Sequence, residues 1–318
     1  MKGKKIVSTL LALLLLASLP VSALAAEWDI SKGDITVNAG SGGQTVTQGG
    51  GAAVEDNAPV IKGSSTENTV TINAEKDQTA NVTLSGANID VSSAGKAAVS
   101  TTGEGNVSIE LDGDNTLKSA TNHAGLEKNN GGSLTIADEN KNGKLTAKGG
   151  DYGAGIGGGW RGSGSDITIS GGEVNATGGV NGAGIGGGCY GYGNNITVSG
   201  DAKLKVQGGV EDNIDGAGAG IGNGGSSDER AIPVTGAEVE PDTSGLTTNG
   251  SIEYYAPGAD MEKDKPEKTT VGTLSPQEKP IEPIEPAVPE QPEAERGADA
   301  PLYRVTDRDG RDIAYTAE

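Results

Sequence analysis

The most chemically suggestive side chains of this sequence lie in two glycine-rich segments. Trp160 and Arg161 follow one copy of the phrase Gly-Ala-Gly-Ile-Gly-Gly-Gly, Tyr190 and Tyr192 follow a second copy 29 residues later, and Tyr152 precedes the first. Exposed Trp and Tyr rings offer flat apolar faces with a polar edge, which suit a sugar ring, and an Arg side chain can hold a carboxylate through a fork of donors. These five residues are one candidate ligand-binding set. The alternative is that the rings pack over neighbouring glycines.

A second candidate set consists of lysines on the outward face of one series of predicted strands. Its members are Lys118, Lys144, Lys148, Lys203 and Lys205. Because stacked like charges repel, such a cluster suits a polyanion such as a uronic-acid polymer, and we assign Lys144, Lys203 and Lys205 to its binding. The alternative is a solvated face, on which Glu173 and Asp90 alternate with the lysines and discourage edge association.

Catalytic and metal-binding patterns are weak. With one His (His123) and one Cys (Cys189), the chain has no familiar pair of nucleophile and base, and no zinc pattern. Cys189 cannot form an internal disulfide, and we expect an idle thiol in a loop or a thiol that pairs between molecules. Residues 138–143 open like a calcium loop, but Gly149 stands where a bidentate Glu is needed. Calcium stays a possible cofactor without assigned ligands, and we expect no catalytic residues.

The elements that position these residues follow from an internal repeat. The glycine phrase occurs at 153–159 and 182–188 and in altered form at 218–224, and Ile-Thr-Ile-Ser at 167–170 recurs as Ile-Thr-Val-Ser at 196–199. Between the glycines, apolar and polar residues alternate with a period of two, which predicts short strands. Each period holds three strands separated by Gly, Asn and Asp. A repeat of this kind is typical of a parallel β-helix, in which each strand pairs with its counterpart one coil further on.

Five coils with three inward-facing columns can be followed from residue 81. The first strands supply Val82/Leu84, Val107/Ile109, Leu134/Ile136, Ile167/Ile169 and Ile196/Val198. The second strands supply Ile89/Val91, Leu117, Leu145/Ala147, Val174/Ala176 and Leu204/Val206. The third strands supply Ala97/Val99, Ala124/Leu126, Ala154/Ile156, Ala183/Ile185 and Ala219/Ile221.

The remaining segments frame these coils. Residues 1–25 have the basic start, apolar run and small-residue cleavage site of a secretory signal, and the run is too short for a membrane span. We predict an N-terminal cap and degenerate coil at 26–80, in which 52–54 resembles the third strand, then coils at 81–225 and a C-terminal cap at 226–273. A disordered Pro/Glu-rich linker at 274–300 follows, and a short hairpin at 301–318 is a truncated or partner-dependent element.

Composition narrows the class of protein. The chain has no Phe and 3% aromatic residues, which disfavours a broad globular core but suits a narrow bore of Val, Ile, Leu and Ala. Loss of three lysines with the signal changes the formal charge from −20 to −23, and we expect no nucleic-acid partner. We therefore expect an extracellular, secreted or surface-associated protein that does not insert into the membrane.

Several phrases carry a family resemblance. These are Trp28-Asp29-Ile30-Ser31, Leu111-Asp112-Gly113-Asp114-Asn115-Thr116-Leu117, His123-Ala124-Gly125-Leu126 and the glycine blocks. Over roughly residues 27–273 the chain resembles the secreted carbohydrate-binding domain-containing β-helix proteins of Firmicutes. The resemblance implies a right-handed parallel β-helix, binding of cellulose or acidic plant polysaccharide, and bound calcium without catalysis.

Together these features predict a non-catalytic protein that binds plant-type or acidic polysaccharide. Two other classes stay open. One is a structural adhesin or spacer of the bacterial surface, whose acidic C-terminal tail reaches other surface proteins. The other is a calcium-dependent polysaccharide lyase, for which Arg161 is the only arginine before residue 226.

Overall fold

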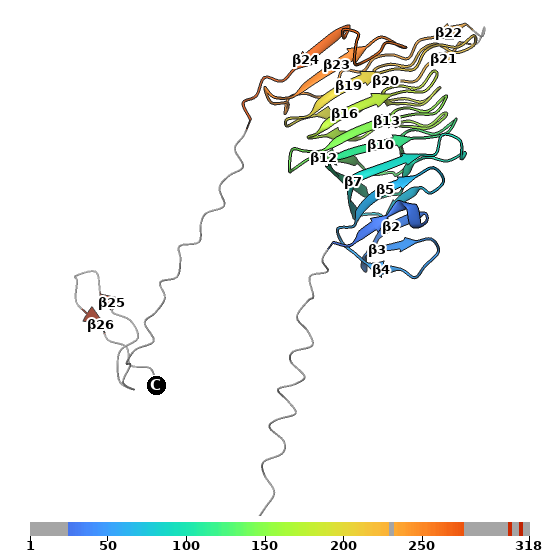
Figure 1. The fold of residues 1–318 in the computed structure, drawn as a ribbon. Coiled ribbons are helices and arrows are strands. Elements are labelled where there is room, and N and C mark those ends of the chain that lie inside the picture. Colours follow the sequence, from blue (N-terminus) through green and yellow to red (C-terminus); the bar gives the residue numbers. More distant parts are fainter. Residues whose placement is uncertain (1–24, 229–231, 277–304, 307–311, 314–318) are drawn as a thin grey trace, which may run out of the picture. The chain divides into compact units, whose positions relative to one another are not determined.

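The protein is an all-β parallel β-helix, as the sequence predicts. A computed structural model describes residues 25–228 and 232–276, together with the strands at 305–306 and 312–313. The chain divides into two compact units, residues 1–276 and 277–318. In the first unit the strands stack coil upon coil, from blue β2 to orange β23 in Figure 1.

Three parallel columns of strands build the coils. The first column contains the first half of β7 (Thr79–Asp90), β9 (Asn106–Asp112), β12 (Leu134–Ala137), β15 (Ile167–Ile169) and β18 (Ile196–Val198). The second contains the second half of β7, β10 (Asp114–Lys118), β13 (Lys144–Lys148), β16 (Glu173–Thr177), β19 (Lys203–Gln207) and β23 (Ser251–Tyr255). The third contains β2 (Ile35–Gly40), β6 (Val70–Ala74), β8 (Val99–Gly103), β11 (Leu126–Lys128), β14 (Ile156–Gly157), β17 (Ile185–Gly186) and β20 (Ile221–Gly222).

The core is the bore between these columns. In the third column Leu126 pairs with Ile156, Ile156 with Ile185, and Ile185 with Ile221, and none of these side chains is exposed. Similar apolar side chains thus stack directly above one another about 4.8 Å apart, which allows a narrow bore to be filled without large aromatic residues. The predicted third column is confirmed.

The predicted register of the first coil was wrong by two residues. Val107 pairs with Ala80 and Ile109 pairs with Val82, whereas the sequence pattern predicts Val82 and Leu84 as their partners. The cause is that β7 runs for 12 residues through the corner that separates the first and second strands in later coils. A shift of two keeps every side chain on its own face, so the alternating pattern alone cannot detect it.

Different elements lie at the N-terminal end. β2 forms an antiparallel pair with β3 (Gly43–Gln48), which pairs in turn with β4 (Val54–Glu55), while β1 (Glu27–Asp29) and β5 (Val60–Ser65) pair in parallel. The 3-10 helix η1 (Ile30–Lys32) follows β1. The predicted likeness of 52–54 to an inward third strand is wrong, because Val54 is half exposed on an antiparallel edge.

The C-terminal end is covered by residues after the last coil. β23 continues the second column, and β24 (Lys268–Val271) pairs with it in antiparallel orientation. Bridges from Asp242 to Thr197 and from Glu238 to Gly222 reach the other two columns. The strands β21 (Ser226–Ser227) and β22 (Pro233–Val234) form a small antiparallel pair.

The second unit is described only in part. Its strands β25 (Val305–Thr306) and β26 (Asp312–Ile313) pair in antiparallel orientation, with Val305 opposite Ile313. The predicted signal at 1–25 falls outside the described residues except for residue 25, and most of the predicted linker at 274–300 also falls outside them.

Candidate functional site

The glycine phrase shapes the corners that carry the aromatic residues. Gly157 and Gly186 have φ of +133° and +131°, and a Cβ atom on either would lie 2.0 Å from the carbonyl oxygen of the equivalent glycine one coil further on. Only glycine permits this approach. Tyr152, Arg161 and Tyr190, in the loops on either side, adopt positive φ of 70°, 59° and 64°. Such values are uncommon for non-glycine residues and mark these turns as tightly constrained.

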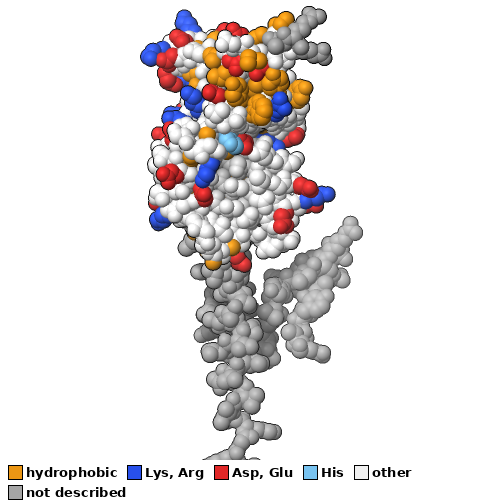
Figure 2. All heavy atoms as spheres, turned by 90° about the vertical axis from the view of Figure 1, so that its right-hand side faces the viewer, with side chains coloured by type: hydrophobic (Ala, Val, Ile, Leu, Met, Phe, Trp, Pro, Cys, Tyr) orange, Lys and Arg blue, Asp and Glu red, His pale blue; other side chains and the backbone are white. Residues whose placement is uncertain are grey.

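Two aromatic side chains of these loops, Trp160 and Tyr190, lie close to Arg161. Its guanidinium carbon lies 4.5 Å from the centroid of the Trp160 ring and 5.7 Å from that of Tyr190, so the cation lies close to both rings. Trp160, Tyr190 and Tyr192 are 48%, 38% and 66% exposed. We call Trp160, Arg161, Tyr190 and Tyr192 the aromatic corner. Figure 2 shows hydrophobic side chains gathered on the upper part of the face that it draws.

Tyr190 is fixed by its phenol group. The hydroxyl donates to Asp215 Oδ1 at 2.6 Å and lies 2.6 Å from Ser227 Oγ. The hydrogen bond to the Asp215 carboxylate raises the pKa of Tyr190. The orientation of the Tyr190 ring is therefore set by the segment that contains Asp215. This segment is an insertion that the two complete glycine repeats do not contain.

Cys189 lies in the predicted loop beneath this corner, and its side chain is fully buried. Its Sγ lies 3.6 Å from Asp215 Oδ2. Burial, and next the charge of Asp215, raises the pKa of the thiol to about 12. The longer segment between β19 and β20 covers the thiol. This segment has no counterpart in the two complete repeats, so the repeat does not predict that Cys189 is buried.

The lysines share a face but do not form an uninterrupted positive column. Along one row the strand partners are Asp114, Lys144, Glu173 and Lys203, which alternate in charge. Lys144 Nζ lies 3.0 Å from Glu173 Oε2, and each holds the pKa of the other group toward its charged form. This arrangement matches the alternative of a solvated face.

Of the other four lysines, two are paired with carboxylates and two are not. Lys205 Nζ lies 2.9 Å from Glu262 Oε1, and Lys118 Nζ lies 3.2 Å from Asp90 Oδ2. Lys148 and Lys203 are exposed, and neither forms an ion pair with another residue in the described part of the chain. Glu262 is 57 residues from Lys205, and the repeat pattern does not predict this pair.

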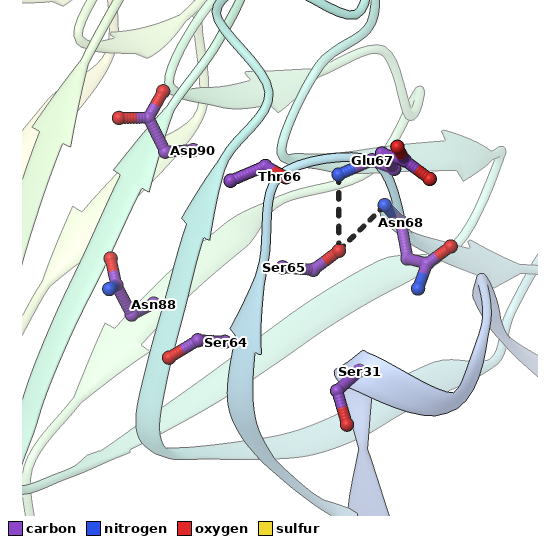
Figure 3. A pocket seen from close by; sticks show the side chains of 8 residues that line it. All are labelled: Ser31, Ser64, Ser65, Thr66, Glu67, Asn68, Asn88 and Asp90. Carbon is purple, nitrogen blue, oxygen red and sulfur yellow. Dashed lines mark hydrogen bonds between the residues drawn. The ribbon is translucent and has the colours of Figure 1, made fainter.

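A polar hollow that sequence reasoning missed lies along the corner after the second strands. Its volume is about 360 Å³, and its lining includes Ser31, Ser64, Thr66, Asn88 and Asp90. Figure 3 shows these side chains, with Ser65 Oγ accepting from the backbone N–H groups of Glu67 and Asn68. A second hollow of about 350 Å³ shares Asp90 and reaches Lys148 and Asp151. Small polar residues in successive coils form no recognisable motif, so the sequence does not predict this groove.

Two acidic clusters, at Asp112 and at Asp212, have carboxylates that already accept hydrogen bonds from the protein. Asp112 accepts hydrogen bonds from Ser85 Oγ at 2.7 Å and Asn142 Nδ2 at 2.9 Å, and Asp212 Oδ1 accepts from the backbone of Ile214 and Asp215. Within the described ranges, no group of three or more His, Cys, Asp or Glu side chains is arranged to hold a metal ion.

His123 is paired with a buried carboxylate. Its Nδ1 lies 2.9 Å from Glu127 Oε2, and Glu127 also accepts from Ala124 N and Asn129 Nδ2. Among the described residues, no Ser, Thr or Cys side chain hydrogen-bonds to His123. The geometry orients an imidazole ring but brings no nucleophile to it.

Comparisons of the chain with protein-family models, curated proteins and solved structures found no match. Over the residues that the structure describes, no helix has the length and apolar character needed to cross a membrane.

Proposed function

We propose that this protein is a non-catalytic carbohydrate-binding protein of the cell exterior, with the aromatic corner as its principal binding surface. The observation that carries the proposal is the exposed Trp160 ring held against Arg161, beside Tyr190, with the exposed Tyr192 two residues further along the chain. Aromatic faces bind the apolar faces of sugar rings, while the phenol and guanidinium groups supply polar edges. Because Arg161 and the Tyr190 hydrogen bonds fix the rings before a ligand arrives, little conformational entropy is lost on binding.

The paired lysines favour a neutral polysaccharide over an acidic one. A polyanion would have to displace Glu173 from Lys144 and Glu262 from Lys205, on a chain whose formal charge is −20. Exposed ion pairs are individually weak, so the local balance of charge decides whether a polyanion can displace these carboxylates. That balance gives no positive excess along the row of Asp114, Lys144, Glu173 and Lys203.

The proposal is tested with the double variant Trp160→Ala/Tyr192→Ala. We expect retention on insoluble and soluble plant polysaccharides to weaken by about tenfold or more, because two stacking faces are lost. The matched control is Val54→Ala, which removes a half-exposed apolar side chain at the opposite end of the coils. Circular dichroism should be unchanged in both. Equal retention by the double variant and the parent would remove the aromatic corner from carbohydrate recognition.

The acidic alternative is tested with Lys144→Gln/Lys203→Gln/Lys205→Gln against polygalacturonate, with calcium and with chelator. If the lysines form a solvated face, the variant and the parent bind alike in chelator. A loss confined to the variant would assign uronate recognition to the lysine face. A loss caused by chelator in both proteins would indicate calcium bridging. Release of unsaturated uronate ends would support the lyase alternative.

The adhesin alternative has one observation in its favour. Val210, Ile214, Ile232 and Val234 are 42–57% exposed near the aromatic corner, and aliphatic side chains suit a protein contact better than a sugar. Replacing Ile214 and Val234 with Ser should leave glycan retention unchanged under our proposal. Loss of attachment to other surface proteins with glycan retention intact would favour the adhesin.

A further inference from the structure

The two polar hollows form one continuous line along the axis of the β-helix. Ser64 on β5 pairs with Asn88 on β7, and Asp90 pairs with Lys118 on β10, which pairs with Lys148 on β13. Successive strands of a column are about 4.8 Å apart, so these three steps from β5 to β13 span about 15 Å. The groove is therefore long in the direction of the axis.

The far end of the groove lies close to the aromatic corner along the chain. Asp151 lines its far end, and the next residue is Tyr152, whose carbonyl accepts a hydrogen bond from Cys189 N at 2.9 Å. Cys189 directly precedes Tyr190, so Tyr152 joins the groove to the aromatic corner through the backbone. Tyr152 is half-buried at positive φ, which holds it at this junction.

Several polar groups in the groove are free to bind. The side chains of Ser64, Thr66 and Asn88 form no hydrogen bond with any described residue. Asp90, in contrast, accepts from Ser92 Oγ at 2.6 Å and from Lys118 Nζ at 3.2 Å, so its orientation is fixed. Free hydroxyl and amide groups beside a fixed carboxylate are suited to the many hydroxyl groups of a sugar chain.

The charge of the groove opposes a polyanion. Its lining contains three carboxylates, Glu67, Asp90 and Asp151, and two lysines, Lys118 and Lys148. One of the lysines is already paired with Asp90. With no positive excess locally and a formal charge of −20 overall, a neutral chain is preferred.

We infer that the groove binds one extended stretch of a neutral polysaccharide, several sugar residues long and parallel to the β-helix axis, in continuity with the aromatic corner. The inference rests on the proposed carbohydrate function and adds to it a ligand class, a direction and a length. It requires affinity to rise with chain length until the groove is filled.

The test is calorimetric titration of the full chain with cello-, xylo- and manno-oligosaccharides from disaccharide to hexasaccharide, and with polygalacturonate in chelator. For at least one neutral series, affinity should rise with length. The variant Ser64→Ala/Asn88→Ala should bind the disaccharide like the parent but bind the hexasaccharide about tenfold more weakly, since each lost hydrogen bond to a ligand costs a few-fold in affinity. Ser64→Arg, which fills the groove, should have the same effect.

The matched control is Asn175→Ala. Asn175 lies in the same outward row as Asn88, through Thr116 and Thr146, but lines neither hollow. It should bind every oligosaccharide like the parent.

The outcomes separate the two proposals. If no glycan binds the parent, the proposed function itself fails. If glycans bind but affinity is independent of length, or rises equally in Ser64→Arg, the groove inference is overturned and the aromatic corner stands alone. Tighter binding of polygalacturonate than of any neutral series in chelator would overturn the assignment of a neutral ligand.

Discussion

At the scale of single residues, Cys189 shows how the aromatic corner is supported from below. The thiol is fully buried, and its pKa is raised to about 12 by burial and by Asp215. Since the thiolate is the reactive form, both the burial of the thiol and its raised pKa protect the native protein from alkylation.

We therefore expect native Cys189 to resist iodoacetamide at pH 8 and to react within the same period after unfolding in guanidinium. Mass spectrometry of the intact chain measures the modification, and Cys189→Ser serves as the unreactive control. Rapid modification of the native protein would mean that the segment bearing Asp215 opens and that Tyr190 is less firmly fixed than its hydrogen bonds indicate.

Ile169 tests the inward column at one position. It stacks between Ile136 and Val198 with no exposed surface, whereas its neighbour Thr168 points outward. Ile169→Ala should destabilise the fold by about 2–5 kcal/mol through lost burial and a cavity, and Thr168→Ala should have a much smaller effect. Thermal melting followed by circular dichroism measures both. Equal shifts in the two variants would contradict the alternation of inward and outward side chains.

At the scale of elements, the glycine stack sets how closely neighbouring coils approach. A Cβ on Gly186 would lie 2.0 Å from the carbonyl oxygen of Gly222, at a φ of +131°. Gly42, in contrast, has open space around it and no positive φ. A Gly→Ala substitution would therefore clash with backbone at Gly186 but not at Gly42.

Gly186→Ala should therefore destabilise the protein by at least about 2 kcal/mol, while Gly42→Ala should be close to neutral. Denaturant unfolding of the two variants and the parent provides the comparison. A stable Gly186→Ala protein would mean that the third column can separate locally without disturbing the rest of the stack.

The columns were readable from the sequence because Ile156, Ile185 and their counterparts combine a two-residue alternation with a fixed repeat. The pairing of Lys205 with Glu262 was not readable, because it joins a coil to a later non-repeating segment. The same holds for Asp215 over Cys189. The groove at Ser64 and Asn88 was not readable either. It depends on which outward residues of successive coils are neighbours, and the two-residue register shift in β7 hides those neighbours from the repeat pattern.

At the scale of the whole molecule, hydrogen-bonded carboxylates determine the response to acid. Hydrogen bonds from Ser85 and Asn142 lower the pKa of Asp112, those from Thr247 and Lys141 lower that of Asp201, and those from Ser92 and Lys118 lower that of Asp90. A carboxylate whose pKa is lower in the folded state contributes stability above its unfolded value of about 3.9, and this contribution is lost as pH falls through the folded value. Burial raises the pKa of Glu110, which acts in the opposite direction at a single site.

We expect the melting temperature to fall as pH decreases below about 4, with the loss continuing at lower pH. Asp112→Asn should be less stable than the parent at neutral pH and should lose less on acidification. Scanning calorimetry across this range measures both effects. A melting temperature that stays constant or rises as pH falls below about 4 would mean that the hydrogen-bonded aspartates contribute no net stability.

Both ends of the coil stack carry antiparallel strand pairs. β3 and β4 are antiparallel at one end of the third column, and β24 is antiparallel at the end of the second. A fibril of parallel coils grows only when each new strand can copy the direction of the one beneath it, and an exposed edge is the template for such growth. At the C-terminal edge of the second column a second molecule meets β24, whose direction is reversed, so its coils cannot continue that column. The reversed β24 thus blocks parallel growth at this edge of a sequence that repeats itself.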